Sequence, residues 1–525
     1  IVLPALLAGL CATTWADEPK SAARFEDAFE ARVQEHVLPN GLRVLVLERH
    51  EAPVVSFETM VNVGAVDEHV GITGVAHIFE HMAFKGSKEI GTTDYAAEEA
   101  ANRKLDEAFE KLTAARVARR PEAELKALQA EFDRLQDEAG KFVINNEYSV
   151  IMEQNGASGL NASTNSDTTQ YHVSLPSNKV EMWFALEADR FETPVLREFY
   201  KEKNVVMEER RMRTESSPAG RLDEEFESIA FKAHPYGYPV IGHASDIAHL
   251  RRSEAAEFYR AHYAPNDITI AVVGHVDAKQ CFAWADKYFG KLQRGPAPRP
   301  VETEEPPQAG ERRVEIESPS QAQVMIGWHK CSAKDKDEPV FDVMARVLGS
   351  GGGGRRGGGG HASRFSKVLV KEKQVALSAS ADSDDPGAKY PNLFVVSGQA
   401  AFGKTADELE QGLEEEVDRL TKEPVPEAEL ARVKTLARAG FIRSMTSNAG
   451  LAMRLARAQT ILGDWREAFR ELRELEAVTA DDILRVAKKT FTKENRVVGR
   501  SVPKAREGGE RPERRGGGES SGEVR

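Results

Sequence analysis

The chain has 525 residues, 30% of them charged, and a formal net charge of −13. This length accommodates two or more domains with complete hydrophobic cores. Because the chain is acidic and its Lys and Arg residues are scattered, the composition excludes nucleic acid as the main partner.

The N-terminal residues 1–16 form an apolar run, rich in Leu and Ala, that ends before Asp17. This pattern is typical of the hydrophobic region and cleavage site of a secretory signal peptide, here without an initiating Met or a basic start, so we expect a partial signal peptide. A transmembrane anchor is the competing interpretation, but the run is too short to span a bilayer, and no later segment approaches that length. The expected location is the periplasm or another exported compartment of a bacterial envelope.

The chain contains three cysteines, and Cys11 would be removed with the signal peptide. Cys281 and Cys331 would then remain. A disulfide between them is compatible with export, but no spacing indicates it, and neither cysteine has the spacing of a zinc ligand.

Two strands joined by a turn are predicted first, at residues 33–37 and 42–47, with Pro39-Asn40-Gly41 between them. A further alternating run at 54–63 leads to Gly64. Strands then alternate with frequent helices, which predicts an α+β fold built in layers.

His77, Glu80 and His81 are ionisable residues within the otherwise apolar segment 75–84. Residues four apart share a helix face, so the two imidazoles can bind one metal ion while Glu80 stands beside it as a general base. Left unpaired on a buried helix, each group would carry a desolvation cost that a divalent cation offsets. The alternative is two core histidines and a salt-bridged glutamate, but the complete H-x-x-E-H array is typical of an inverted zinc motif.

Residues 92–145 interrupt the alternation with two charge-rich segments in which Leu and Phe recur at intervals of three and four. The pattern predicts an antiparallel helical hairpin that turns at Arg119-Arg120-Pro121. A solvated structural insertion and a substrate-recognition arm are both open interpretations. Charged helical faces are common, which favours the first.

A proline-rich and acidic segment at 296–308 predicts a linker between an N-terminal domain, 25–295, and a C-terminal domain, 309–503. The second domain begins with predicted strands and a helix from Pro339 to Leu348. It resembles a distant repeat of the first domain without the zinc motif.

Two segments of the second half have little to bury. Gly349–Gly360 has the composition of a mobile surface loop and lacks the Lys-Ser or Lys-Thr of a phosphate-binding loop; a loop reaching toward the active chamber is the alternative. Residues 504–525 are rich in Gly, Glu, Arg and Ser, and we expect them to be disordered.

Motifs along most of the chain resemble the pitrilysin family of zinc peptidases, which includes insulin-degrading enzyme and mitochondrial processing peptidase. The resemblance is carried by the segments Leu38–Leu42, Gly71–Ser87, Asn161–Tyr171, His234–Gly237 and Tyr263–Gly274. It implies two homologous α/β-layered domains, with the helical hairpin as an insertion in the first, in a half-length bacterial member of the family.

In this family a glutamate on a second helix provides the third metal ligand. The resemblance implies that Glu209 binds one zinc ion per chain together with His77 and His81. Glu202 lies seven residues before Glu209 on the same helix face, whereas Glu208, the alternative ligand, is turned about a quarter-circle away. Glu202 is expected to steady the ligands or the transition state.

The predicted reaction is metal-assisted peptide hydrolysis. Zinc lowers the pKa of a bound water to about 7 in comparable sites, and Glu80 takes the proton of the attacking water and delivers it to the leaving amine. Asn161, Ala162 and Ser163 match the family's substrate-side edge strand, which would pair with extended or unfolded peptides. The alternative for Asn161 is an ordinary residue at a strand end.

The second half departs from the family pattern. Where the family has an arginine and, seven residues later, a tyrosine that contact the substrate, this chain has Lys371 and Ser378. The resemblance therefore implies that this chain is the catalytic subunit of a heterodimer whose other subunit supplies both groups, with a homodimer as the weaker alternative. A non-catalytic structural or binding subunit is the competing function, and the complete set of metal and base residues argues against it.

Overall fold

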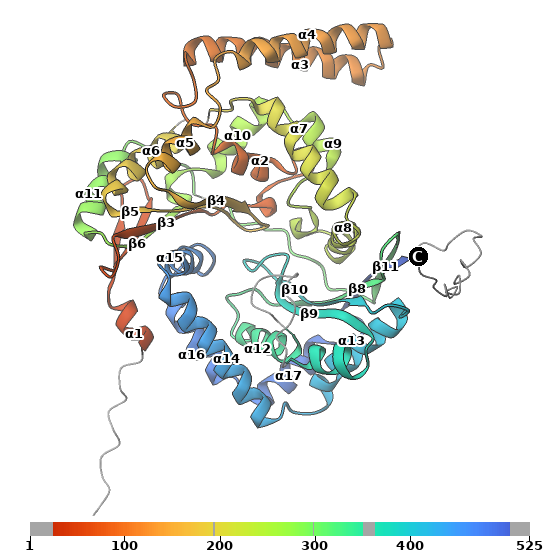
Figure 1. Ribbon diagram of the computed structural model, residues 1–525. Coiled ribbons are helices and arrows are strands. Elements are labelled where there is room, and N and C mark those ends of the chain that lie inside the picture. Colours follow the sequence, from red (N-terminus) through yellow and green to blue (C-terminus); the bar gives the residue numbers. More distant parts are fainter. Residues whose placement is uncertain (1–24, 193–194, 298, 350–362, 504–525) are drawn as a thin grey trace, which may run out of the picture.

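Figure 1 shows the computed structural model, in which residues 25–192, 195–297, 299–349 and 363–503 are described. The predicted signal peptide and the predicted disordered tail lie outside these residues, as does the glycine-rich segment beyond Gly349. Among the described helices, none is long and apolar enough to cross a membrane.

A mixed sheet of six strands forms the centre of the first half. Its order is β1-β2-β6-β3-β5-β4, and these strands are Val33–Val37, Arg43–Glu48, Ile268–Gly274, Val54–Val61, Thr169–Pro176 and Ser158–Thr164. Only the β2 and β6 pair is parallel. Strand β6 is buried along its whole length, as expected for an apolar strand between two neighbours, while β4 ends the sheet. The strands predicted at the start of the chain are confirmed.

The second half repeats this topology with five strands. Their order is β7-β11-β8-β10-β9, with bounds Arg312–Ser318, Arg496–Pro503, Gln323–Lys330, Asn392–Ala400 and Ala376–Asp385. Here β7 and β11 are the parallel pair. Each strand therefore corresponds to one in the first sheet, and β9 takes the edge position of β4. The predicted α+β fold with two homologous layered halves is confirmed.

Helices connect the strands and cover the sheets. In the first half, beside the hairpin, these are α1 (Phe25–Glu30), α2 (Val75–Met82), α5 (Glu147–Gln154), α6 (Val180–Glu192), α7 (Phe199–Arg210), α8 (Pro218–Ala230), α9 (Ala244–His249), α10 (Arg252–His262) and α11 (Ala278–Phe289). In the second half they are α12 (Glu338–Leu348), α13 (Ala406–Lys422), α14 (Glu427–Thr446), α15 (Asn448–Arg457), α16 (Glu467–Ala477) and α17 (Ala480–Thr490).

One helix of each half packs on the sheet of the other half. Helix α8 packs on β7, β8 and β11 so closely that a Cβ at Gly327 would lie 2.7 Å from the Phe226 ring. Helix α15 buries Leu451 and Leu455 against the first sheet, beside Met60. These shared cores join the two halves.

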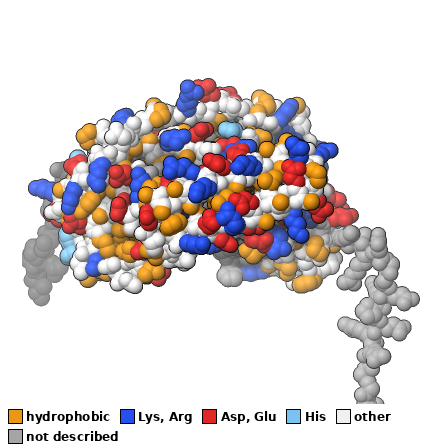
Figure 2. Space-filling view, turned by 90° about the horizontal axis from the view of Figure 1, so that it is seen from above, with side chains coloured by type: hydrophobic (Ala, Val, Ile, Leu, Met, Phe, Trp, Pro, Cys, Tyr) orange, Lys and Arg blue, Asp and Glu red, His pale blue; other side chains and the backbone are white. Residues whose placement is uncertain are grey.

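The predicted helical hairpin is confirmed as α3 (Tyr95–Val117) and α4 (Glu122–Gly140), which extend away from the body (Figure 1). Its inner faces are apolar, with the Phe109 and Phe132 rings 5.9 Å apart. Seen from above, the surface carries acidic and basic side chains interspersed with one another (Figure 2). The two helices therefore pack on each other through a narrow apolar seam, which continues onto Tyr200 of α7.

The two cysteines within the described residues are free thiols, so the disulfide considered from the sequence does not form. Cys281 is buried in the core of the first half, and Cys331 packs against the core of the second. Their separate locations account for the absence of a bond.

Glu58 is an isolated carboxyl group within the first sheet. It is 1% exposed on β3, directly opposite His172 on β5, and its Oε1 has no hydrogen-bond partner among the described residues. Burial raises the pKa of Glu58 to about 8 and lowers the pKa of His172. Both side chains are therefore neutral in the folded protein at pH 7.

We expect Glu58→Gln to weaken the pH dependence of stability. The pKa of Glu58 is higher in the folded than in the unfolded chain, so the folded state holds the extra proton between about pH 4.5 and 8, and stability falls as the pH rises through this window. Gln keeps the shape without ionising. The melting temperature of the variant should therefore fall less between pH 5 and pH 9 than that of the wild type, and parallel curves would contradict this account of Glu58.

Candidate metal centre

Carboxyl groups hold the turn from which helix α2 begins. Gly74 precedes the helix with a φ of 88°, in the left-handed region that favours glycine. The buried Glu68 accepts hydrogen bonds from the backbone N–H groups of Gly74 (2.7 Å) and Ala76 (2.8 Å). Asp246 accepts a further bond from Thr73 Oγ1 at 2.7 Å. These oxygens satisfy N–H groups that a helix N-terminus leaves free, so the start of α2 is fixed.

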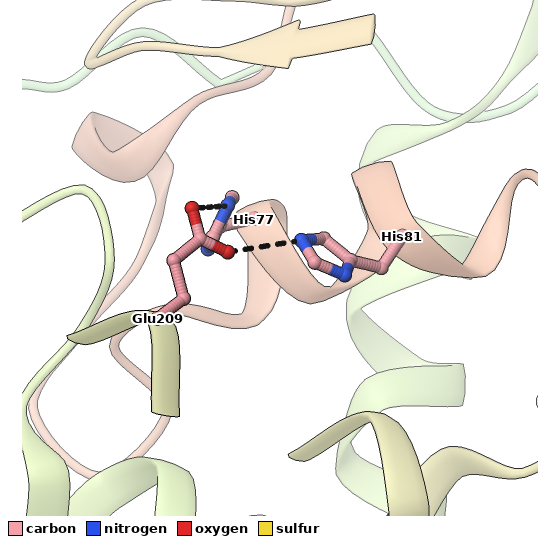
Figure 3. Close-up of side chains that lie close together, drawn as sticks. All are labelled: His77, His81 and Glu209. Carbon is pink, nitrogen blue, oxygen red and sulfur yellow. Dashed lines mark ion pairs between the residues drawn. The ribbon is translucent and has the colours of Figure 1, made fainter. Parts of the chain in front are cut away.

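Helix α2 buries its apolar side chains and presents its two histidines to α7. Val75, Ile78 and Phe79 lie in the core of the first half. His77 is 7% exposed, and Figure 3 shows its imidazole and that of His81 each facing one oxygen of the Glu209 carboxylate. The spacing of four residues thus places both rings on one face, as predicted.

The carboxylate between the imidazoles belongs to Glu209. Its Oε1 lies 3.7 Å from His77 Nε2 and its Oε2 lies 3.4 Å from His81 Nε2. The three donor atoms all lie within 4.8 Å of one another. Tetrahedral zinc with bonds of about 2.0–2.1 Å needs donors roughly 3.3 Å apart, so this donor set fits a zinc ion. Glu208 is not part of this donor set, and its side chain is 62% exposed and pairs with Arg211.

The charges of the three groups are coupled. Burial, followed by the neighbouring charge of His81, lowers the pKa of His77 to about 4. Burial also opposes the charge on His81, but hydrogen bonds to Glu202 and Glu209 outweigh it and raise the pKa to about 9. The His81 hydrogen bond lowers the pKa of Glu209. A divalent cation would take the place of the proton that His81 shares with Glu209, next to the neutral imidazole of His77.

Glu202 lies behind His81, away from Glu209. Its Oε2 is 3.4 Å from His81 Nδ1, and Lys85 forms an ion pair with it. Lys85 also donates to Glu198 at 3.0 Å. A carboxylate on the second ring nitrogen fixes the orientation and tautomer of a metal-binding histidine, so the position of Glu202 suits the steadying role predicted for it.

Glu80 lies between the two histidines in the sequence of α2 but is not one of the three residues of the donor set. It interacts with Thr164 of β4, and burial raises its pKa above the ordinary value for glutamate. A carboxyl group that stands beside the donor set without belonging to it, and whose pKa is raised, is suited to proton transfer.

A cavity of about 1280 Å³ opens in front of the metal centre. Asn161, Ala162 and Ser163 of β4 form part of its wall, next to the histidines. The second half contributes Asp382, Asp384, Asp385 and Pro386, from β9 and the loop after it, to the lining of the cavity. Lys371 and Ser378 are not among the lining residues.

The sequence interpretation missed two cations at the centre. Arg213 Nη1 lies 2.7 Å from Glu209 Oε1, and Lys85 pairs with Glu202. Both follow a predicted ligand by four residues, since Arg213 follows Glu209 and Lys85 follows His81. This helical spacing is a signal that could have identified them.

Two family models match the chain. The model described as insulinase, peptidase family M16, matches residues 43–115 and 122–244, which include every residue of the metal centre. The model described as the peptidase M16 inactive domain matches residues 249–436. The chain belongs to peptidase family M16. The resemblance to pitrilysin-type peptidases is thereby confirmed.

Several named relatives of this M16 chain are described as proteases. Zinc protease PqqE of Helicobacter pylori is 26% identical over 467 residues, which cover 86% of this chain and 89% of the relative. A probable mitochondrial-processing peptidase subunit beta of Schizosaccharomyces pombe is 23% identical, over 89% of this chain and 91% of the relative.

Solved structures share the fold. A protease from Helicobacter pylori superposes with a TM-score of 0.75 at 23% identity, covering 90% of this chain and 99% of that one. The periplasmic protease PqqL of Escherichia coli gives a TM-score of 0.64 at 16% identity, and the match covers 90% of this chain but 47% of PqqL. This M16 chain thus corresponds to about half of the longer protease.

We expect Glu209→Gln to abolish the binding of one zinc ion per chain, because a neutral amide replaces the carboxylate that forms the donor set with both imidazoles. Glu208→Gln, at the adjacent exposed position, should leave zinc content unchanged. Zinc per folded chain, measured by atomic emission after gel filtration, distinguishes the two residues. Loss of zinc from the Glu208 variant alone would assign the ligand to Glu208.

Proposed function

We propose that this chain is a zinc-dependent peptidase that hydrolyses extended or unfolded peptides. The observation that carries the proposal is the convergence of His77, His81 and Glu209 at one cavity wall, which Glu80 also lines. The names of the relatives as zinc proteases support it. Zinc bound at these residues would polarise the scissile carbonyl and acidify the attacking water.

The protein residues carry the proton transfers and the orientation. The Glu80 carboxylate accepts a proton from the attacking water and then donates it to the leaving amine. Burial raises the pKa of Glu80 toward neutral pH, where a general base transfers protons most effectively. Glu202 holds the His81 ring through Nδ1, and Lys85 neutralises Glu202.

Strand β4 provides the proposed binding surface for the peptide backbone. It ends the first sheet and borders the cavity, and Asn161 and Ser163 are exposed on it. An edge strand can pair with an extended peptide through main-chain N–H and C=O groups, which selects unfolded substrates irrespective of most side chains. Because Thr164 of β4 is hydrogen-bonded to Glu80, a peptide bound along β4 would lie next to the Glu80 carboxyl group.

A second subunit completes the proposed enzyme. The chain matches about half of PqqL, and a relative from fission yeast is named as a subunit. Neither Lys371 nor Ser378 reaches the cavity lining, so groups equivalent to the family's arginine and tyrosine would come from another chain. A heterodimer in the bacterial periplasm is our proposal, with a homodimer as the weaker form.

A non-catalytic subunit is the alternative function. It is motivated by the inactive-domain model, but that model matches residues 249–436, beyond the metal centre. The complete donor set and the adjacent Glu80 favour catalysis.

Glu80→Gln should separate metal binding from catalysis. Gln cannot accept the proton of the attacking water, so we expect peptide cleavage to fall by about 10²–10⁴-fold while zinc content stays at one per chain. The test is a fluorogenic peptide assay with zinc analysis of the same sample. Full activity in the variant would exclude Glu80 as the base.

Adding the second subunit should raise activity. We expect native purification of the full chain to yield a complex larger than its own 57.9 kDa, containing a different chain. Peptide hydrolysis by the isolated chain should be at least tenfold slower than by the complex. Equal rates for the two samples would contradict the heterodimer.

A further inference from the structure

Arg213 is a cation in direct contact with the proposed metal ligand. It lies in η3 (Arg211–Glu215), a single π-helical turn that continues α7, and its Nη1 is 2.7 Å from Glu209 Oε1. The turn follows the ligand helix without a break, so Arg213 stands one turn beyond Glu209. Such π turns are frequent at functional sites.

The backbone of Arg213 is held by the helix that follows. A Cβ at Gly220, in the first turn of α8, would lie 2.0 Å from the carbonyl oxygen of Arg213, so only glycine permits this close approach. Ser217 caps α8 by accepting a hydrogen bond from Gly220 N at 3.2 Å. The arginine therefore extends from a turn whose place is fixed by packing, although its side chain is 72% exposed at the cavity.

The contact differs from an ordinary surface ion pair because its carboxylate is largely shielded from water and faces the two histidines. The Glu209 side chain is 14% exposed and its two oxygens each face an imidazole. A bond from Arg213 to Oε1 restricts rotation of this carboxylate about its last torsion angle. An exposed helical ion pair contributes little to stability, so the consequence of this contact lies in orientation.

Two opposite effects on a metal ion can be compared. A cation near the centre repels zinc, but the charge of an exposed guanidinium is strongly screened by water. Orientation of the ligand acts at hydrogen-bond distance, and loss of such outer partners typically weakens metal binding by about 10–100-fold. Orientation is therefore the larger effect.

We propose that Arg213 is a positioning residue that holds the Glu209 carboxylate toward both imidazoles and thereby strengthens zinc binding. The proposal rests on the proposed zinc peptidase function. It assigns Arg213 no contact with the reacting atoms.

The chain offers a matched control in Arg211. This arginine lies in the same π turn, is 64% exposed and binds Glu208 at 2.7 Å, but Glu208 does not face the histidines. Replacing Arg211 removes the same charge and a similar helical ion pair from a neighbouring position. A change in zinc binding in the Arg211 variant would therefore come from the loss of charge or from a weaker turn.

The experiment measures zinc dissociation constants of the full chain by competition with a chromophoric chelator. We expect Arg213→Met to raise the constant about tenfold, Arg213→Lys to raise it less because a point charge remains without the planar fork, and Arg211→Met to stay within twofold. The melting temperatures of the metal-free variants verify folding. At saturating zinc the kcat and KM of Arg213→Met should return to wild-type values.

Three results would overturn the proposal. They are an unchanged zinc constant in Arg213→Met, an equal rise in Arg211→Met, and a raised KM at saturating zinc, which would instead make Arg213 a substrate contact. A wild-type chain that binds no zinc would contradict the proposed function as well. Zinc binding by the wild type with no change in Arg213→Met contradicts the positioning role alone.

Discussion

The position of the Glu209 carboxylate between two imidazoles is the constraint on which the site depends. The imidazoles share one helix, whereas Glu209 belongs to α7, so the packing of α7 decides whether the donors meet. Just before α7, Arg197 is 1% exposed and binds Glu98 Oε1 at 2.8 Å. At its end, Arg210 donates to the carbonyl oxygen of Gly242 at 2.8 Å. Buried, hydrogen-bonded cations at both ends leave α7 little freedom to move.

The helical hairpin contributes to the same packing. Lys203 of α7 donates to the carbonyl oxygen of Leu250 at 2.6 Å, and its Nζ lies 4.3 Å from the centre of the Phe109 ring of α3. Burial lowers the pKa of Lys203 to about 7. Tyr200 donates to Asp106 of α3 at 2.8 Å. The middle of α3 thus supports the ligand helix, which favours the structural interpretation over a substrate arm.

The two halves share a topology and differ in what their helices carry. Helix α12 follows β8 as α2 follows β3, but it buries Phe341, Val343 and Met344 and offers no pair of histidines. The second half instead supplies part of the cavity lining from β9, and its helix α15 covers the first sheet. One copy of the repeat carries the proposed chemistry, and the other encloses it. A fold of this kind provides the frame, while a few side chains determine the function.

Local pattern was sufficient for the elements and for part of the site. The spacing of His77 and His81 places both on one helix face because helical periodicity involves only a few neighbouring residues. The strands and the hairpin were predicted for the same reason. Glu209 required the family resemblance, since no local rule links α2 to a helix so far along the chain. The alternation of apolar residues likewise does not say which sheet a helix will cover.

The sequence by itself therefore determined the strands that begin the chain, the helical hairpin, the inverted motif and the repeated halves. Only the tertiary structure decided that Glu209 rather than Glu208 faces the imidazoles, that Arg213 holds its carboxylate, and that α8 and α15 are exchanged between the halves. It also decided that Cys281 and Cys331 stay apart. The physical reason is that these contacts join residues distant in the chain, and the packing of whole elements brings them together.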